Sequence, residues 1–203
     1  RADSRRPLRR AALCAGAAVV AAACARPEPA APPAGEAPAP AACERIASIV
    51  VRKAERILVA ACEGGGELRL PVALARVAGP KQRRGDQRMP EGEFRIAAPM
   101  RASERFHRFL PIDYPTPVDA ARGLAEGIIG QRTHDAIVRA HREGRMPPQE
   151  TALGGHLGFH GEGRRWRGSG ALDWTEGCVA LSDADVERLG ERAPPGTPVR
   201  IEP

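Results

Sequence analysis

A proline-rich stretch near the N-terminus divides the chain and limits where a folded domain can lie. Residues 25–42 consist mainly of Ala and Pro. Proline at this density interrupts both helices and sheet ladders, because it lacks the N–H donor that each requires. We therefore predict a linker over residues 25–43 and one folded domain over residues 44–203, which is long enough to bury a single core of ordinary size.

The segment before the linker has the pattern of an export signal. Arg5, Arg6, Arg9 and Arg10 form a positive region, and residues 11–23 form an apolar run of 13 residues. Such a run is too short for a membrane-spanning helix and typical of a signal peptide, so we predict an export signal over residues 1–24. The alternative is a loosely anchored N-terminus that is amphipathic or disordered.

Two processing routes fit the end of this segment. Residues 21–24, Ala-Ala-Ala-Cys, resemble a lipobox in which Cys24 receives lipid. Ala23-Cys24-Ala25 also fits cleavage between small residues without lipid, and residues 4–9 resemble a twin-arginine signal. All these readings predict a protein of the cell envelope on the periplasmic side, in contact with membrane only through its N-terminal lipid or signal.

The charge distribution argues against nucleic acid as a partner. The formal net charge is +6, but the first 24 residues contain five Arg and one Asp, a net of +4, which leaves +2 for the remainder. No basic stripe is present there, and aromatic residues are only 3% of the chain. Nucleic-acid binders usually combine a basic stripe with aromatic stacking platforms.

The folded domain reads as mostly β with a few helices. Short β-prone runs occupy residues 46–51, 57–61, 68–77, 94–96, 157–160 and 199–201. Residues 133–141 predict a helix with Thr133 as N-cap, and Ser182 followed by Asp185 predicts the start of another that ends near residue 192. No glycine-rich phosphate motif follows a strand, so a Rossmann sheet is not expected.

Cys178 and His160 are the residues most suited to catalysis. A lone Cys is more often a small buried hydrophobe than a nucleophile, and a lone His at a strand end is more often structural. Cys178, however, follows Thr175-Glu176-Gly177, a turn that Thr175 can brace and in which Gly177 leaves backbone N–H groups uncovered for an oxyanion. An imidazole beside a thiol can take its proton and pass it to a leaving amine.

Zinc is the alternative ligand for these groups. His156, His160 and Cys178 offer two nitrogens and one sulfur. On a strand, residues four apart lie roughly 13 Å from each other and cannot share one ion. We therefore expect neither a metal nor a cofactor.

Several motifs together resemble the L,D-transpeptidase (YkuD) family. The signature is His160-Gly161 followed 18 residues later by Cys178 in a Thr-x-Gly-Cys turn. The other pieces, in the family's order, are Gly79-Pro80-Lys81, Gly85-Asp86, Pro90-Glu91-Gly92-Glu93-Phe94, Asp113-Tyr114-Pro115 with Asp119, the Gly154–Gly161 strand and Gly196-Thr197-Pro198-Val199. The resemblance covers residues 46–203 and implies a β-sandwich-like fold.

The resemblance also implies acyl transfer on peptidoglycan stem peptides. Cys178 would attack the carbonyl of the third, L-configured residue, and His160, oriented by a neighbouring backbone carbonyl, would act as base and then acid. The N–H groups of Cys178 and Gly177 would hold the oxyanion, and an amine or water would resolve the thioester. The residues expected to border the substrate are Tyr114, Gly161, Trp174, Thr175 and Glu176. Core packing is the alternative for Tyr114 and Trp174, and a solvated turn position for Glu176.

The chain departs from the common family turn, S-H-G-C-x-R. Glu176 replaces the second His, Ala180 replaces the Arg, and Met89 stands where Thr is usual. The form W-T-x-G-C-x-A-L resembles a branch that includes a peptidase or amidase releasing lipoprotein from the wall. The resemblance therefore leaves open a transpeptidase, a hydrolase (L,D-carboxypeptidase or amidase), an envelope lipoprotein as acceptor or substrate, and a non-catalytic wall-binding module.

Cys43 and Cys62 remain once Cys14, Cys24 and Cys178 have other assignments. An oxidising compartment favours their pairing. A hairpin centred between Ala54 and Glu55 would set Cys62 opposite Ala47, however, so the chain would have to bend after Ile46 to bring Cys43 within disulfide range. We state the disulfide as a hypothesis, with two free thiols as the alternative.

Overall fold

The computed structural model describes residues 43–162 and 173–203, and all of these lie within one compact unit. The predicted export signal, Cys24 and the linker up to residue 42 lie outside the described residues. Within the described part, no helix is long and apolar enough to cross a bilayer.

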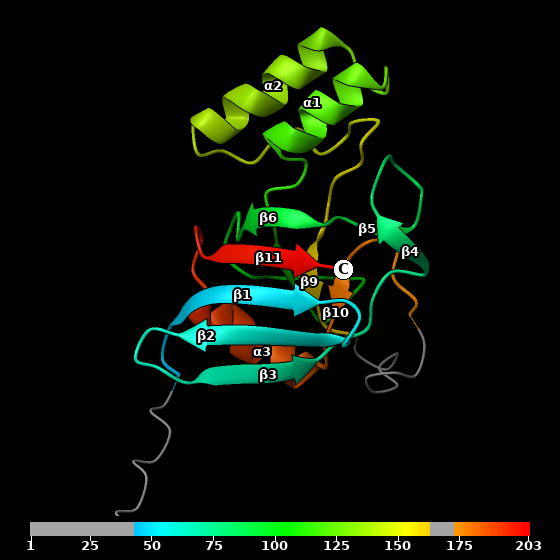
Figure 1. Cartoon of the computed structure of the whole chain (residues 1–203). Helices are drawn as coiled ribbons and strands as arrows, with labels where there is room; N and C mark the ends of the chain where they lie inside the picture. Colours follow the sequence, from blue (N-terminus) through cyan, green and yellow to red (C-terminus); the bar gives the residue numbers. More distant parts are fainter. Residues whose placement is uncertain (1–42, 163–172) are drawn as a thin grey trace, which may run out of the picture. The chain divides into compact units, whose positions relative to one another are not determined.

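Two sheets share one hydrophobic core (Figure 1). The first has the order β3-β2-β1-β11-β6, the second β10-β9-β8-β7, and β4 pairs with β5 alone. Core side chains come from the first sheet (Ile49, Leu58), the second (Leu110, Phe159) and helix α3 (Leu189), and all five are at most 1% exposed.

The strand bounds are β1 Ile46–Arg52, β2 Ile57–Cys62, β3 Glu67–Pro71, β4 Val77–Pro80, β5 Arg88–Met89, β6 Gly92–Arg95, β7 Arg101–Ala102, β8 Arg108–Pro111, β9 Gly158–His160, β10 Val179–Ala180 and β11 Pro198–Glu202. The helices are α1 Pro117–Ala125, α2 Gln131–Arg142 and α3 Asp183–Arg192. Five of the six predicted strands are found at their expected places. The predicted helix α3 is present with Ser182 as its N-cap, and the Ser182 hydroxyl accepts from Asp185 N at 3.1 Å.

The predicted strand over residues 68–77 is wrong in its length. β3 ends at Pro71, because the next residues leave β2 and reach the second sheet. There Ala73 and Ala180 exchange two backbone hydrogen bonds of 2.9 Å, and Ala75 bridges Thr175. This segment therefore joins the first sheet to the turn that carries Cys178.

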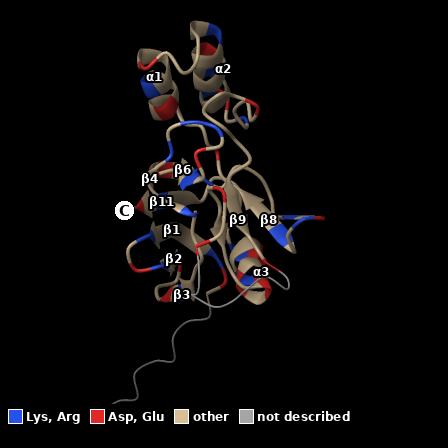
Figure 2. Cartoon of the chain, turned by 90° about the vertical axis from the view of Figure 1, so that its right-hand side faces the viewer, with Lys and Arg blue, Asp and Glu red and all other residues tan. Residues whose placement is uncertain are grey.

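The helical region between β8 and β9 was only partly predicted. Helix α2 starts at Gln131 with Gly130 as N-cap, so the predicted N-cap at Thr133 is wrong: Thr133 lies inside the first turn. Helix α1 was not predicted, although Thr116 and Asp119 form a capping box around Pro117. The two helices lie side by side beyond β6 in both views (Figure 1 and Figure 2) and share a small core of their own with Ile129 and Leu153.

The disulfide between Cys43 and Cys62 is confirmed, with Cα atoms 5.4 Å apart. The hairpin register is the predicted one from Arg52 opposite Ile57 to Ser48 opposite Ala61. A register shift then places Cys62 opposite Ile46 rather than Ala47, and this irregularity brings Cys43 within reach. Arg192 donates to the Cys43 carbonyl at 2.8 Å and holds the start of the domain on α3.

We predict that removing this disulfide destabilises the domain. It closes a loop with a sequence separation of 19, for which the chain-entropy model gives roughly 3 kcal/mol. The double substitution Cys43→Ser with Cys62→Ser should lower the free energy of unfolding in urea by about that amount. A reducing agent should destabilise the parent protein and leave the double variant unchanged; equal responses would contradict the prediction.

Candidate active site

A parallel strand pair brings the two predicted catalytic residues to one place. β9 pairs with β10 so that Phe159 lies opposite Val179 and His160 opposite Ala180. Cys178 immediately precedes β10 and therefore lies beside the start of β9. Both side chains line one cavity of about 350 Å³, together with Trp174, Thr175 and Glu176.

Hydrogen bonds within residues 175–178 fix the cysteine turn. Thr175 is 3% exposed, and its hydroxyl donates to the Cys178 carbonyl at 2.7 Å. The same hydroxyl oxygen accepts from Gly177 N at 3.4 Å. The turn is tied to the first sheet by Arg76 N, which donates to the Thr175 carbonyl at 3.1 Å.

Gly177 is required by the backbone conformation as well as by space. Its φ is +136°, a region that residues with a side chain rarely adopt. A Cβ at this position would lie 2.9 Å from Arg88 O and 3.0 Å from Leu157 Cδ2. The residue before Cys178 must therefore be glycine for the turn to keep this shape.

Cys178 is the single free cysteine of the described residues and is half-buried. Burial raises the pKa of its thiol to about 11, although a hydrogen bond from the Gly158 backbone and the charges of Lys81 and Arg105 act in the opposite direction. The thiol donates to the His156 carbonyl at 3.7 Å. At neutral pH it is therefore protonated, not a resting thiolate.

His160 is 1% exposed and neutral. Burial lowers the pKa of its imidazole to about 4; the carbonyl of Gly161 opposes this change and the charge of Arg105 reinforces it. Nδ1 lies 2.8 Å from the Gly161 carbonyl oxygen, which can only accept, so Nδ1 carries the hydrogen. Nε2 therefore keeps the lone pair that a general base requires.

Gly161 orients this histidine and leaves no room for a larger residue. A Cβ there would lie 2.5 Å from Asp183 Oδ1 and 3.1 Å from His107 Cβ. Gly161 is itself buried and does not line the cavity. The prediction that Gly161 borders the substrate therefore does not fit the cavity. Its carbonyl instead sets the tautomer of His160.

The lining of the cavity is predominantly basic. Its charged residues are Arg76, Lys81, Arg84, Arg105 and Glu176. Arg84 pairs with Glu150, while Arg76 and Arg105 form no ion pair with any acid of the described residues. The cavity therefore offers two guanidinium groups to an anionic ligand.

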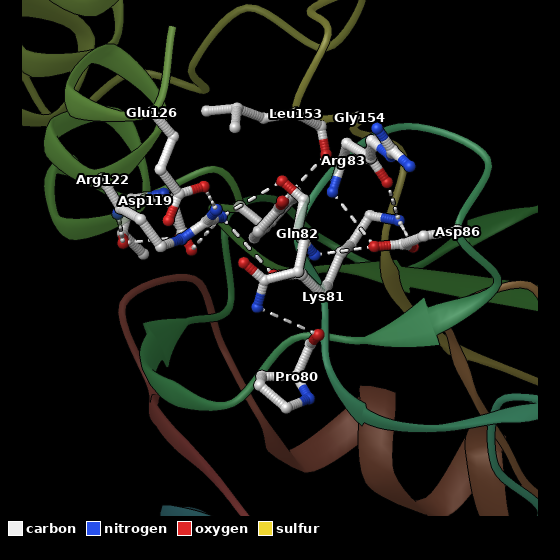
Figure 3. Close-up of polar contacts among 12 residues, drawn as sticks. Pro80, Lys81, Gln82, Arg83, Asp86, Asp119, Arg122, Glu126, Leu153 and Gly154 are labelled. Carbon is white, nitrogen blue, oxygen red and sulfur yellow. Dashed lines mark hydrogen bonds and ion pairs between the residues drawn. The ribbon is translucent and has the colours of Figure 1, made fainter. Parts of the chain in front are cut away.

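Lys81 is buried at the cavity wall and held by Asp86 (Figure 3). Its ammonium donates to Asp86 Oδ1 at 2.8 Å and to the Arg83 carbonyl at 3.2 Å. Burial opposes ionisation of Asp86, but the bond from Lys81 and bonds from three backbone N–H groups outweigh it and lower the pKa of this carboxyl. The Asp86 carboxylate and its bonds thus fix the loop between β4 and β5 at the cavity.

A model of the L,D-transpeptidase (YkuD) catalytic domain matches residues 46–201. The chain belongs to this family. The match and the two-sheet architecture confirm the predicted family and the mostly β fold class. No curated protein sequence matches the chain.

Solved structures of similar proteins are distant in sequence. The L,D-transpeptidase from Mycobacterium smegmatis aligns with 11% identity and a TM-score of 0.45, covering 76% of this chain and 58% of that one. The Enterococcus faecium L,D-transpeptidase C442S mutant aligns with 12% identity and a TM-score of 0.46, covering 78% and 50%. The L,D-transpeptidase from Xylanimonas cellulosilytica aligns with 16% identity and a TM-score of 0.41, covering 83% and 65%.

Tyr114 does not border the cavity. It is 0% exposed, packs against Phe94 with ring centroids 6.3 Å apart, and donates its hydroxyl to the Leu153 carbonyl at 2.9 Å. Burial raises the pKa of this phenol. Tyr114 is therefore a core residue, as the alternative prediction held. Through its hydroxyl it links the segment that follows α2 to the sheets.

Five cavity residues were missed by sequence reasoning: Arg76, Arg84, Gln87, Arg105 and Phe106. Lys81 was noted only as part of a motif. No periodic or spacing signal marks these positions, since they reach the cavity from irregular segments: the one before β4, the loop between β4 and β5, and the turn between β7 and β8. No group of three or more possible metal ligands occurs in residues 43–162 and 173–203.

The buried neutral His160 predicts a specific pH dependence of stability. Its pKa is lower in the folded protein, about 4 against 6.5, so the unfolded chain binds more protons between these values. The difference in pKa corresponds to about 3 kcal/mol of the free energy of unfolding. This contribution is complete above pH 6.5 and is lost as the pH falls to 4. Urea unfolding at pH 7 and pH 4.5 should show a smaller pH effect for His160→Gln than for the parent; equal pH effects would contradict this.

Proposed function

We propose that this protein is a peptidoglycan-modifying cysteine acyltransferase acting on the L,D-peptide bond of stem peptides. Membership of the family supports the substrate class. The observation that carries the proposal is that a protonated thiol and a neutral, oriented imidazole line one basic cavity.

The first half-reaction is acyl transfer to the enzyme. The Cys178 thiol attacks the peptide carbonyl while its proton passes to His160 Nε2, so charge develops on the carbonyl oxygen only as the bond forms. The Cys178 N–H stabilises this oxyanion, with Gly177 N–H as second donor once it leaves its 3.4 Å contact with Thr175. The imidazolium then protonates the leaving amine, and a thioester remains.

The second half-reaction resolves the thioester. An acceptor amine, or water, attacks the carbonyl and gives its proton to His160, and the sulfur leaves as the thiol after proton return. Glu176 is exposed at the cavity edge, where it would hold a cationic amine or polarise a water. An amine acceptor defines a transpeptidase, whereas water defines the L,D-carboxypeptidase or amidase that is the second candidate.

The proposed substrate also indicates where the protein acts. An enzyme that modifies peptidoglycan works in the cell envelope, and an export signal with lipidation at Cys24 would anchor it there. An envelope lipoprotein remains a possible acceptor or substrate. A non-catalytic wall-binding module is the competing proposal, and turnover measurements exclude or favour it.

We expect turnover of purified muropeptides to depend on both dyad residues. Cys178→Ser should abolish product formation, and His160→Ala should lower kcat/KM by roughly 10²–10⁴-fold with the fold intact, since only general-base catalysis is lost. Mass spectrometry of the products separates a cross-linked dimer from a shortened stem. Binding without turnover by the parent protein would favour the wall-binding module.

We also expect the unpaired guanidiniums to select for a free carboxylate. Arg76 Nε donates to the Trp174 carbonyl at 3.0 Å, and Arg105 lies over the Phe106 ring, so both are held at the cavity without an acidic partner in the described chain. Losing one charged hydrogen bond costs about 1.5–3 kcal/mol, or roughly 10–100-fold in kcat/KM. Arg105→Gln and Arg76→Gln should show this loss with a stem peptide that ends in a carboxylate.

The matched control uses the same peptide with a C-terminal amide. The two variants should then equal the parent, and Arg132→Gln, on the exposed face of α2, should be unchanged with both peptides. An equal loss on acid and amide would mean that these arginines support the site without recognising the carboxylate.

A further inference from the structure

Two aromatic side chains enclose the imidazole of His160. Phe106, in the turn between β7 and β8, stacks on it with ring centroids 3.9 Å apart and planes at 17°. Trp174 meets it edge-on, at 5.6 Å and 66°. The two aromatic rings also touch each other, with centroids 6.1 Å apart.

One ring nitrogen and the backbone of His160 are also held in place. Nδ1 is bound to the Gly161 carbonyl, and the backbone of His160 lies between Phe109 of β8 and Ala180 of β10. Since His160 lines the cavity while only 1% exposed, its access is through the edge that bears Nε2.

Both aromatic residues are anchored outside the dyad. Phe106 N donates to Ser103 Oγ at 3.0 Å, and the next residue, His107, contacts Glu187 of α3 at 2.8 Å. Trp174 Nε1 donates to Glu162 Oε1 at 2.9 Å. The 103–107 turn and its contact with α3 therefore help to position the Phe106 ring, and Glu162 helps to position the Trp174 indole.

We propose that Phe106 and Trp174 are positioning residues that exclude water from His160 and hold its Nε2 toward the cavity as a neutral base. This inference rests on the proposed function for its catalytic meaning. The rings themselves exchange no proton. They favour the uncharged imidazole because an imidazolium loses its hydration when an apolar ring covers its face.

Charged groups on several elements surround His160 and its two aromatic neighbours. Positive and negative groups have opposite effects on the pKa of His160. Arg105, beside Phe106, disfavours a second positive charge and lowers the pKa of His160 after the larger effect of burial. The other titratable or charged groups on adjoining segments include Arg76 and Lys81 of the cavity, Glu104 and His107 of the turn, Arg108 of β8, Glu162 after β9, Asp173 beside Trp174, Asp183 and Glu187 of α3, and Glu176 and Cys178 of the turn before β10. A test must therefore remove an aromatic ring without changing any of these charges.

The test is the titration of His160 by NMR in the whole protein, with its resonance identified as the one missing from the His160→Gln spectrum. Phe106→Ala should raise the pKa of His160 from about 4 toward its ordinary value of 6.5, because water reaches the exposed ring face. The acid limb of kcat/KM should move to higher pH by the same amount, and kcat should fall at least tenfold. Phe106→Tyr, which keeps the stacked ring, should restore both.

Two further variants keep the test decisive. Phe94→Leu weakens an aromatic pair elsewhere in the core and should leave the His160 titration unchanged. Should Phe106→Ala not fold, Phe106→Leu and Trp174→Leu replace it, with a smaller upward change expected from each. A His160 titration in the folded Phe106 and Trp174 variants identical to that of the parent overturns the inference.

The outcome is separable from that of the proposed function. NMR titration needs no substrate, so a raised His160 pKa in a protein without turnover keeps the enclosure and rejects the acyltransferase. Turnover with an unchanged titration keeps the acyltransferase and rejects the enclosure.

Discussion

The parallel pairing of β9 with β10 is the interaction on which the site depends. Only four residues form the ladder, Phe159 and His160 with Val179 and Ala180, yet it joins the strand that bears the base to the turn that bears the thiol. The turn is held from the other side by Ala73, Ala75 and Arg76, which continue from the first sheet. Both sheets therefore contribute to the position of Cys178.

Burial determines the charge state of this dyad. It raises the pKa of the Cys178 thiol and lowers that of the His160 imidazole, so both groups are neutral where a solvated pair would lie closer to ionisation. In the proposed mechanism, proton transfer is coupled to attack on the substrate, and Arg76 and Arg105 bind the anionic group of the substrate.

The structure shows where positive charge at the cavity comes from when the family's usual Arg is absent. Ala180 stands where the common turn carries Arg, and it is 0% exposed in β10. Positive charge at the cavity comes from other segments instead: Lys81 before β5, Arg76 before β4 and Arg105 before β8. The chain thus keeps the Cys and His of the family motif, and the basic groups at its cavity come from segments other than β10.

The sequence by itself determined most strands and the helix after Ser182, because these depend on local patterns of alternation and capping residues. The domain limits, and Cys178 and His160 as the reactive pair, are predictions that rest on composition, on a glycine turn and on the family motif. The sequence also allowed the Cys43–Cys62 pairing, but the register shift that brings these residues together arises from sheet packing. Only the tertiary structure decided that Tyr114 belongs to the core and that Phe106 and Arg105 reach the site. These placements depend on contacts between segments far apart in the chain, which the local pattern of residues does not record.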